Sequence, residues 1–322
     1  MVDLKVLLVE SIDQRAVALL SAVAEVVVAK GYDEAALLEQ CRDVDGMIIR
    51  AQGVASRKLM ENCPRLKVVG RHGVGLDNID VEAATDLGVW VVYTPLANNE
   101  SVAEHAITML VALSKQLFKA DRAFRQGYWR GRFEFHGNEV RGKTLGIVGV
   151  GRVGSRLAEI ARRGFEMQIL YYDVVPNRKV EEELGGRRCE LDEVLSQSDC
   201  VSLHVPLIPA TEHLIGAKQL ALMKPSAFLL NLSRGKVVDE KALIEALQGG
   251  KIAGAGLDVF ETEPLPQDSP LLKMDNVIVT PHMASHTKEG LLAMAMVARD
   301  IIAVLQGQKP EFPANQPKNR RK

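Results

Sequence analysis

The chain has 322 residues, of which 47% are hydrophobic and 25% charged, and its formal net charge is -1. This composition is typical of a globular protein with enough core for about two domains. The near-neutral charge does not favour nucleic acid or an anionic membrane as a partner, and no apolar run reaches membrane-spanning length.

The four cysteines, Cys41, Cys63, Cys189 and Cys200, form no CxxC pair and no metal-ligand spacing. They predict reduced, partly buried thiols in a reducing compartment, and we expect no metal site. Met1 leads directly into a strand-like apolar run without a basic leader or cleavage site, which predicts a cytoplasmic protein.

The first third of the chain alternates short apolar runs with helical patterns, which predicts a parallel sheet covered on both faces. The expected strands are Val6–Val9, Val26–Val28, Met47–Ile49, Lys67–Val69 and Val89–Val92. The expected helices are Gln14–Val23, Asp33–Gln40, Ser56–Asn62 and Val81–Leu87. After the fourth strand, Gly73-Val74-Gly75 forms a glycine-flanked turn whose N–H groups could bind an anion. A plain turn explains this local pattern equally well.

A long helix is expected next. Ser101-Val102-Ala103-Glu104 has the pattern of a capping box, and apolar spacing carries the helix to about Phe124. Such a helix could connect two α/β units and form a subunit contact, or it could be a core helix. A further apolar helix is expected from Lys288 to about Gln306. The polar, basic end from Pro313 to Lys322 predicts a disordered tail rather than a nucleic-acid patch.

The second α/β unit contains a glycine loop, residues 149–154, with the pattern GxGxxG. The expected strand Thr144–Val148 precedes the loop and the helical pattern Ser155–Ala161 follows it. A second strand, Gln168–Tyr172, then ends at Asp173. This order of strand, turn, helix, strand and acid is typical of a dinucleotide site, although a glycine-rich turn that binds nothing is the alternative.

Each part of this pattern has a physical role. Gly149 permits the turn, Gly151 lets the backbone approach a pyrophosphate, and Gly154 lets the helix pack on its strand. The helix N-terminus offers N–H groups to the phosphates. Asp173 would accept hydrogen bonds from the ribose and repel a 2′-phosphate, which favours NAD over NADP. The basic residues Arg178 and Lys179 could weaken that preference.

Three later strands end in ionisable residues, and in an open parallel sheet such ends border one crevice. Arg234 follows the strand Phe228–Asn231, Glu263 follows Ala255–Val259, and His282 follows Val277–Thr280. Reduction of a 2-keto acid needs a cation for the carboxylate and carbonyl, which the forked guanidinium of arginine suits. It also needs a proton donor of near-neutral pKa, as histidine is, and a carboxylate to orient that imidazole and raise its pKa. Taken singly, each of the three has an ordinary structural explanation.

The chain resembles the D-isomer-specific 2-hydroxyacid dehydrogenases, 3-phosphoglycerate dehydrogenase-like in a short form without a regulatory domain. The resemblance runs from about Ile48 to Thr287. It is carried by these motifs: Gly73-Val74-Gly75-Leu76-Asp77-Asn78, Ser101-Val102-Ala103-Glu104-His105, the glycine loop, Leu203-His204-Val205-Pro206-Leu207, Met223-Lys224-Pro225, Asn231-Leu232-Ser233-Arg234-Gly235, Leu257-Asp258-Val259-Phe260, Glu263-Pro264 and Thr280-Pro281-His282.

The resemblance implies an α/β fold with two Rossmann-like, doubly wound parallel-sheet domains. A flavodoxin-like substrate domain would comprise residues 1–97 and 288–322, with an NAD-binding domain of residues 98–287 inserted into it. The implied catalytic set is Arg234, Glu263 and His282, with His282 as the acid/base. The implied NAD contacts are Gly149, Gly151, Arg152, Val153, Gly154, Asp173, His204, Val205, Pro206, Leu232, Ser233, Arg234, Asp258, His282 and Ser285, of which Asp258 would face the nicotinamide amide.

For the substrate, the resemblance implies binding of the carboxylate by the backbone from His72 to Gly75, with Arg50 nearby and Arg234 on the reacting end. Family members are commonly dimers through the inserted domain, so we expect a homodimer. Two positions depart from the family. His72 replaces a common alanine and could read a second anionic group, and His286 places a second imidazole near His282, where we expect only a helix N-terminal residue.

We therefore expect an NAD-dependent oxidoreductase that interconverts a small 2-keto acid and its D-2-hydroxy acid. The candidate substrates are 3-phosphoglycerate, hydroxypyruvate or glyoxylate, a sulfolactate-like acid and D-lactate. Serine feedback through a regulatory domain is not expected. The alternative is an NAD-sensing corepressor-like binding protein without significant turnover. A formate-type dehydrogenase is disfavoured, because that branch carries glutamine where this chain has Glu263.

Overall fold

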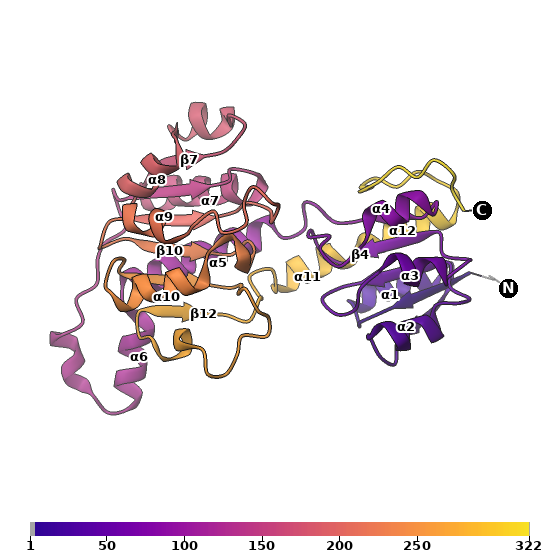
Figure 1. Cartoon of the computed structure of the whole chain (residues 1–322), viewed down its shortest axis with the longest axis horizontal. Helices are drawn as coiled ribbons and strands as arrows, with labels where there is room; N and C mark the ends of the chain where they lie inside the picture. The colour runs from indigo at the N-terminus through magenta and orange to yellow at the C-terminus, as the bar shows by residue number, and fades with distance from the viewer. Residues whose placement is uncertain (1–3, 322) are drawn as a thin grey trace. The chain divides into compact units, whose positions relative to one another are not determined.

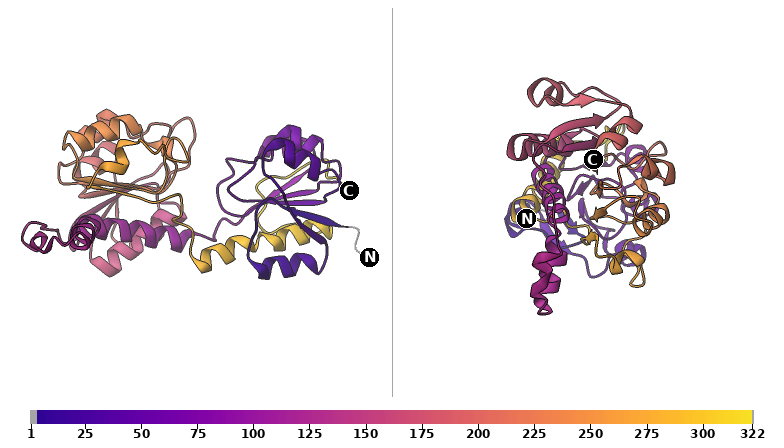
Figure 2. Two further views of the ribbon diagram at one scale, coloured as in Figure 1. Left: turned by 90° about the horizontal axis from the view of Figure 1, so that it is seen from below. Right: turned by 90° about the vertical axis from the view of Figure 1, so that its left-hand side faces the viewer.

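The computed structural model describes residues 4–321, which divide into two compact units. Unit 1 comprises residues up to Asn98 together with those from His286 onward, and unit 2 comprises Asn99–Ser285. Each unit is a parallel sheet with helices on both faces (Figures 1 and 2). The expected α/β class, with one unit inserted into the other, is confirmed. In the described part of the chain, no helix has the length and apolar character needed to span a bilayer.

Unit 1 contains a five-stranded sheet of order β2-β1-β3-β4-β5, in which every pair is parallel. Its elements are β1 (Lys5–Leu8), α1 (Gln14–Ser21), β2 (Glu25–Val28), α2 (Glu34–Gln40), β3 (Gly46–Ile49), α3 (Arg57–Glu61), β4 (Val68–Arg71), α4 (Val81–Asp86), β5 (Trp90–Val92), α11 (Lys288–Ala295) and α12 (Val297–Leu305).

The two faces of this sheet bury alternate residues of the same strands, as the period of two requires. Leu7, Met47 and Ile49 pack under α2, α3 and α4. Val6 and Ile48 pack on the opposite face against α1 and α12. Because both faces are covered, the strands are continuous apolar runs, which is why their positions could be predicted.

Unit 2 contains a seven-stranded sheet of order β12-β11-β10-β9-β6-β7-β8, also parallel throughout. Its strands are β6 (Thr144–Val148), β7 (Gln168–Tyr172), β8 (Arg187–Arg188), β9 (Cys200–Leu203), β10 (Phe228–Asn231), β11 (Gly254–Leu257) and β12 (Val277–Val279). Its α-helices are α5 (Asn99–Ser114), α6 (Leu117–Arg125), α7 (Arg152–Phe165), α8 (Leu191–Gln197), α9 (Ala217–Leu222) and α10 (Glu240–Gln248), and short 3-10 or π turns lie at Trp129–Phe133, Lys179–Glu183, Gly235–Val237 and Pro270–Lys273.

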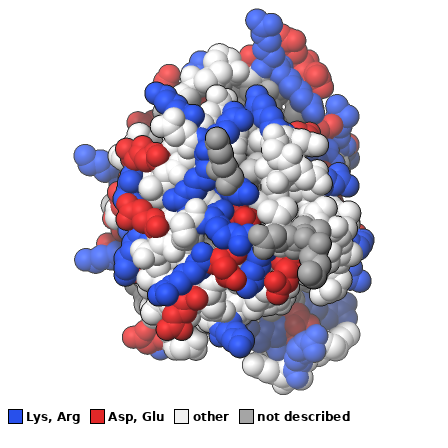
Figure 3. Space-filling model, turned by 90° about the vertical axis from the view of Figure 1, so that its right-hand side faces the viewer, with Lys and Arg blue, Asp and Glu red and all other residues white. Residues whose placement is uncertain are grey.

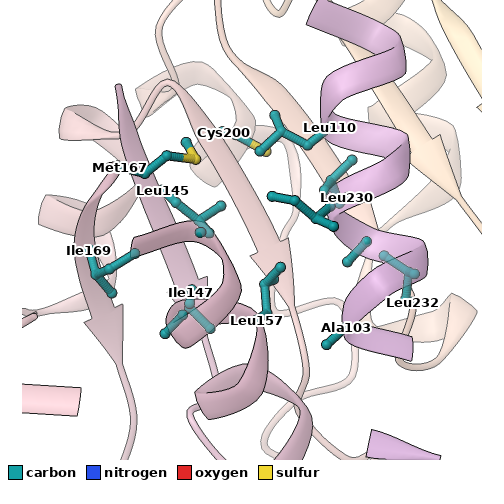
Figure 4. Packing of buried hydrophobic residues seen from close by; sticks show 14 of the residues in the cluster. Ala103, Leu110, Leu145, Ile147, Leu157, Met167, Ile169, Cys200, Leu230 and Leu232 are labelled. Atoms are coloured by element: carbon teal, nitrogen blue, oxygen red, sulfur yellow. The ribbon is translucent and has the colours of Figure 1, made fainter. Parts of the chain in front are cut away.

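Helices α5 and α7 cover one face of this sheet, and α8, α9 and α10 cover the other. Figure 4 shows Ala103 and Leu110 of α5 directed toward Leu157 of α7 and Leu230 of β10. This packing fixes the helix that follows the glycine loop, because α5 and α7 make an extensive contact. The carboxyl ends of β6, β7, β9, β10, β11 and β12 then carry the residues of the candidate site.

Two expected single helices are each divided. The helix expected from Ser101 to Phe124 begins at Asn99 and breaks between α5 and α6, where Gln116 adopts a left-handed conformation with φ 52°. Ser101 therefore lies inside the helix and is not its cap. The last helix is divided at Met296 into α11 and α12. Apolar spacing continues across both breaks, so the pattern could not reveal them.

The expectation that all four cysteines are reduced is wrong for one pair. Cys41 and Cys63 form a disulfide in unit 1, with their Cα atoms 5.5 Å apart, whereas Cys189 and Cys200 are free and buried. Cys41 caps the C-terminus of α2, and Cys63 follows α3. The fold brings these two helix ends together, although 22 residues separate the cysteines. No local motif in the sequence predicts this disulfide.

The disordered tail expected from Pro313 to Lys322 is also wrong for residues 313–321, which pack on unit 1, whereas Lys322 lies outside the described residues. Pro313 forms an antiparallel bridge with Val92, and the N–H of Ala314 donates to the carbonyl of Val91. The side chain of Asn315 is buried and forms hydrogen bonds with the backbone of Val89 and Val91.

Figure 3 shows that basic and acidic side chains are interspersed on the face of the molecule seen there.

Candidate active site

The glycine loop after β6 has the shape that a diphosphate requires. Gly149 has φ 93°, and a Cβ there would lie 2.8 Å from the carbonyl oxygen of His204. A Cβ on Gly154 would lie 2.1 Å from the carbonyl oxygen of Gly149, so only glycine lets α7 start this close to its strand. At Gly151, by contrast, a Cβ would meet no atom of residues 4–321 within 4 Å. The loop is therefore closed on two sides and open where a pyrophosphate would lie.

The N-terminus of α7 faces this opening without a side-chain cap. Gly151 precedes the helix and Arg152 begins it. Uncapped N–H groups and the positive end of the helix dipole together favour a bound anion. The residues of this loop therefore fit the phosphates of a dinucleotide.

Asp173 follows β7 and lies against the loop, as its place in the pattern predicts. One carboxylate oxygen, Oδ2, accepts the N–H of Val150 at 2.8 Å, and Oδ1 accepts the N–H of Val175 at 3.2 Å. The side chain is partly exposed. It therefore combines a negative charge, accessible to a ligand, with a structural contact to the loop.

Asn177 is a residue of this region that sequence reasoning missed. Its amide nitrogen donates to the carbonyl of Val150 at 2.8 Å and to Oγ of Ser155 at 2.9 Å. These contacts join the segment after β7 to both ends of the glycine loop. No motif marks this asparagine, because its partners become neighbours only in the fold.

His204 follows β9 directly and lies beside the same loop. Its Nε2 lies 2.8 Å from Oγ of Ser202, and burial lowers the pKa of the imidazole to about 4. The ring is therefore neutral at physiological pH. Its carbonyl oxygen and the side chain of Val205 lie against Gly149, where they close that side of the loop. Pro206 follows Val205. Because His204 is neutral and the other two side chains are apolar, these three residues border the loop without placing a charge beside it.

Arg234 is held by a turn at the end of β10. The buried Asn231 side chain accepts the N–H and hydroxyl of Ser233 at 3.1 and 2.9 Å and donates to the carbonyl of Arg234 at 2.9 Å. A Cβ on Gly235 would lie 1.9 Å from the carbonyl of Phe260, so this turn touches the loop after β11. Asn231 thus holds the turn that carries Arg234. From the sequence, Asn231 was expected only as the last residue of the strand. Leu232 is buried in the same turn.

Glu263 and His282 are brought together, as predicted. Oε2 of Glu263 lies 2.8 Å from Nδ1 of His282, and Oε1 accepts the N–H of Phe260 at 3.1 Å. Desolvation tends to raise the pKa of Glu263, but the hydrogen bond and charge of His282, the Phe260 N–H and the charge of Arg234 together lower it below its usual value. Glu263 is thus ionised, and Nε2 of His282 is the ring nitrogen left to face a reactant.

Asp258 lies beneath His282 and is 1% exposed. Its Oδ1 accepts the N–H of Met283 at 2.9 Å and the hydroxyl of Thr280 at 2.6 Å, and its Oδ2 accepts the N–H of Ala284 at 2.9 Å. Ser285 is the last residue of unit 2. The carboxylate therefore organises the turn that carries His282.

The turn after β4 in unit 1 has the features of an anion-binding loop. Gly73 has φ 141°, and its carbonyl accepts the N–H and hydroxyl of Thr94, each at 3.1 Å. The guanidinium of Arg71 holds the carbonyl of Gly75 at 2.6 Å. Within residues 4–321, the N–H groups of Gly73, Val74 and Gly75 donate to no other group. They are therefore available to a carboxylate.

His72 is buried behind this turn, 3% exposed, and its Nδ1 has no hydrogen-bond partner among residues 4–321. Burial lowers the pKa of the ring to about 4, and the charges of Arg50 and Arg71 add to the effect. The imidazole is neutral at physiological pH. It therefore supplies no cation for the second anionic group considered from the sequence.

Comparison with known proteins identifies the family. Residues 107–284 match the profile "D-isomer specific 2-hydroxyacid dehydrogenase, NAD binding domain". The chain belongs to the D-isomer specific 2-hydroxyacid dehydrogenase family. It is thus an NAD(P)-dependent oxidoreductase of the CH–OH class, as predicted, and acts on small 2-keto and 2-hydroxy acids.

Two curated relatives illustrate the range of this family. The chain is 45% identical over 284 residues to a glyoxylate reductase of Korarchaeum cryptofilum, covering 87% of this chain and 85% of that one. It is 42% identical over 315 residues to a D-3-phosphoglycerate dehydrogenase of Methanocaldococcus jannaschii, covering 97% of this chain but 60% of the relative. The chain thus spans less than two thirds of the latter protein.

Solved structures agree with this assignment. A glyoxylate reductase from Paecilomyes thermophila superposes with a TM-score of 0.87 at 32% identity, covering 98% of this chain and 99% of that one. A D-lactate dehydrogenase from Aquifex aeolicus, complexed with NAD and lactic acid, superposes with a TM-score of 0.83 at 32% identity, covering 94% and 96%.

Proposed function

We propose that the enzyme reduces glyoxylate or hydroxypyruvate to the corresponding 2-hydroxy acid, giving the D isomer from hydroxypyruvate, with NADH as its preferred cofactor. The choice of substrate rests on His72, whose ring is 3% exposed and neutral and therefore adds no positive charge for a phosphate or sulfonate. The similarity to glyoxylate reductases along 85% of their length is in line with this choice.

In this proposal, His282 donates a proton from Nε2 to the carbonyl oxygen of the keto acid. Glu263 faces the other ring nitrogen and stabilises the protonated imidazole before transfer. Arg234 binds the substrate carboxylate and polarises the carbonyl. Within unit 1, taken by itself, the proposal assigns carboxylate binding to the free N–H groups of Gly73, Val74 and Gly75 and to Arg50. The nicotinamide cofactor, when bound, supplies the hydride.

The preference for NADH over NADPH rests on Asp173, whose partly exposed carboxylate would repel a 2′-phosphate. Asp173→Asn tests this, because the amide oxygen keeps an acceptor for the Val150 N–H while the charge is removed. We expect the ratio of kcat/KM for NADH over NADPH to fall by roughly tenfold or more. An unchanged ratio, or a wild type that prefers NADPH, would contradict this role for Asp173.

We further propose that two copies form a homodimer through α6 and the aromatic segment after it. No residue of α6 is buried within residues 4–321, and Phe118, Phe124 and Trp129 are more than half exposed. Exposed aromatic side chains that lie together, as Phe124 and Trp129 do with their ring centroids 5.5 Å apart, are typical of a protein interface. Light scattering should give a dimer for the wild type and a smaller species for Trp129→Ser. A monomeric wild type would overturn the dimer proposal.

A cytoplasmic location of the enzyme stays a prediction.

The decisive experiment follows NADH oxidation with the purified full chain and five keto acids: glyoxylate, hydroxypyruvate, 3-phosphohydroxypyruvate, sulfopyruvate and pyruvate. We expect kcat/KM for glyoxylate or hydroxypyruvate to exceed that for the two dianionic acids by roughly tenfold or more. A preference for a phosphorylated or sulfonated acid would contradict the substrate assignment. NADH binding without turnover on any acid would favour a binding protein over an enzyme.

Two histidines four residues apart in the sequence provide a matched pair of substitutions for the mechanism. His282→Gln should lower kcat by roughly a hundredfold or more while NADH binding persists, because the proton donor is lost. His286→Gln removes the second imidazole, which lies in unit 1 and outside the proposed catalytic set. It should leave kcat close to that of the wild type. Equal effects of the two substitutions would remove His282 from its proposed role.

A further inference from the structure

We propose that His105 is a positioning residue for His282 and acts on it through Thr280 and Asp258. The inference rests on the proposed acid role of His282. All four residues belong to unit 2. His105 lies on α5, far from the three strand ends in sequence, and no step of the reaction proposed above uses it.

The contacts form a continuous path. Nε2 of His105 lies 3.1 Å from Oγ1 of Thr280, and that hydroxyl lies 2.6 Å from Oδ1 of Asp258. Asp258 in turn binds the turn after β12 by its side chain, through the N–H groups of Met283 and Ala284. Its backbone carbonyl accepts the N–H of His282 at 2.9 Å. The path therefore ends on the backbone of the proposed acid.

Proton counting fixes the direction of this path. A threonine hydroxyl has one proton, and at 2.6 Å from a carboxylate it donates that proton to Asp258. Oγ1 can then only accept from His105, so Nε2 of His105 must carry a proton. The chain of donors runs from His105 through Thr280 to Asp258. This polarises the Thr280 hydroxyl toward the carboxylate and strengthens its bond.

His282 needs such support because its backbone is held in an unfavourable region. Its φ is 49°, a left-handed conformation that non-glycine residues seldom adopt. The surrounding hydrogen bonds must therefore hold the turn in place. With the turn fixed, Nδ1 of His282 stays 2.8 Å from Glu263 and Nε2 keeps its direction. A small displacement of the ring would slow proton transfer even though no reacting group is lost.

Paired substitutions test the path. Thr280→Val removes the hydroxyl at constant shape, and His105→Leu removes the donor. We expect each to lower kcat by on the order of tenfold, to change the KM for the keto acid little, and to enlarge the deuterium isotope effect with 4-deuterated NADH. Thr280→Ser and His105→Gln restore a hydroxyl and an N–H donor and should recover most of kcat. Thr108→Val on the exposed face of α5 is the control and should match the wild type.

The double variant distinguishes a path from two separate effects. Because both substitutions break the same chain, Thr280→Val combined with His105→Leu should lose no more than the larger single loss. Additive losses, or a kcat within about twofold of the wild type for both single variants, would overturn the proposal. If Thr280→Val fails to fold, the comparison of His105→Leu with His105→Gln decides alone. A recovery by His105→Gln supports the path, and equal losses overturn it.

His282→Gln in the same assay separates this inference from the proposed function. If His282→Gln abolishes turnover and both single variants are unaffected, the acid role stands and the path fails. If His282→Gln retains turnover, the proposed acid role itself fails.

Discussion

Nδ1 of His282 lies 2.8 Å from Oε2 of Glu263. The other carboxylate oxygen of Glu263, Oε1, accepts the N–H of Phe260. The carboxylate is therefore fixed by its own backbone before it meets the ring. This arrangement orients the imidazole and places a negative charge beside its protonated form, which is the form that gives the proton in the proposed reaction.

Glu263→Gln keeps a hydrogen-bond acceptor for His282 and removes the charge. The protonated imidazole then loses its ionic partner, while the ring keeps a hydrogen bond that orients it. We expect kcat to fall by roughly tenfold or more, with little change in the KM for the keto acid. Steady-state kinetics with saturating NADH test this. A kcat within about twofold of the wild type would indicate that Glu263 acts only by orienting the ring.

Alanine substitutions at two glycines of the loop should have different effects, one on NADH affinity and the other on stability. Gly151→Ala adds a methyl group into open space, so the fold should keep its melting temperature while NADH affinity falls by roughly tenfold or more. Gly154→Ala forces a methyl group against the Gly149 carbonyl, so the protein itself should lose several kcal/mol of stability, on the order of an overpacked core. Thermal melts and NADH titration separate the two outcomes, and a stable Gly154→Ala with weak NADH binding would contradict this reading.

Two histidines with lowered pKa values predict the acid sensitivity of each unit. His72 in unit 1 and His204 in unit 2 have pKa values lowered to about 4 by burial. Unfolded histidines have a pKa near 6.5, so between these values the unfolded chain binds protons that the native chain does not. Stability is therefore intact above about pH 6.5 and falls toward pH 4, by about 1.4 kcal/mol per pH unit for each ring.

Substituting each histidine in turn tests which unit loses stability toward pH 4. His72→Gln should flatten the pH dependence of the unfolding transition of unit 1, and His204→Gln that of unit 2. Denaturant unfolding between pH 4 and 7 measures both, with the exposed His136→Gln as a control. If the slope for unit 1 is the same with and without His72, its ring does not titrate as described.

The disulfide predicts a thiol count. The denatured, unreduced chain should expose two reactive thiols, those of Cys189 and Cys200, and the reduced chain should expose four. In the native protein both free cysteines should react slowly, because burial raises the pKa of each thiol. Reduction should also lower the stability of unit 1 by about 3 kcal/mol, the size expected for closing a loop of this length. Four reactive thiols without reductant would contradict the pairing.

The repeated alternation of apolar strands and amphipathic helices was enough to predict both sheets. It also placed Arg234, Glu263 and His282 correctly at strand ends, because parallel strands present their carboxyl ends at one edge. Asn177, Asn231 and His105 could not be predicted this way. Each acts through hydrogen bonds to backbone or side chains that become neighbours only after packing, and none belongs to a motif whose spacing implies that contact.

The errors have a common physical origin. Periodicity reports which face of an element is apolar, so it continues through Gln116 although that residue turns left-handed. Composition reports polarity, so residues 313–321 resemble a free tail although Asn315 is buried with three hydrogen bonds. The pairing of Cys41 with Cys63 depends on how two helix ends meet. None of these features is local in the sequence.

The packed tail has a consequence for how the molecules behave toward one another. Strand β5 forms one edge of the sheet in unit 1, and its residues Trp90, Val91 and Val92 are strongly apolar. An open edge of this kind is a template for strand pairing between chains. Pro313 and Ala314 occupy part of that edge, and the proline has no N–H to extend the ladder further. These packed residues thus keep the β5 edge from pairing with a second chain, and their removal would favour aggregates that form through this edge.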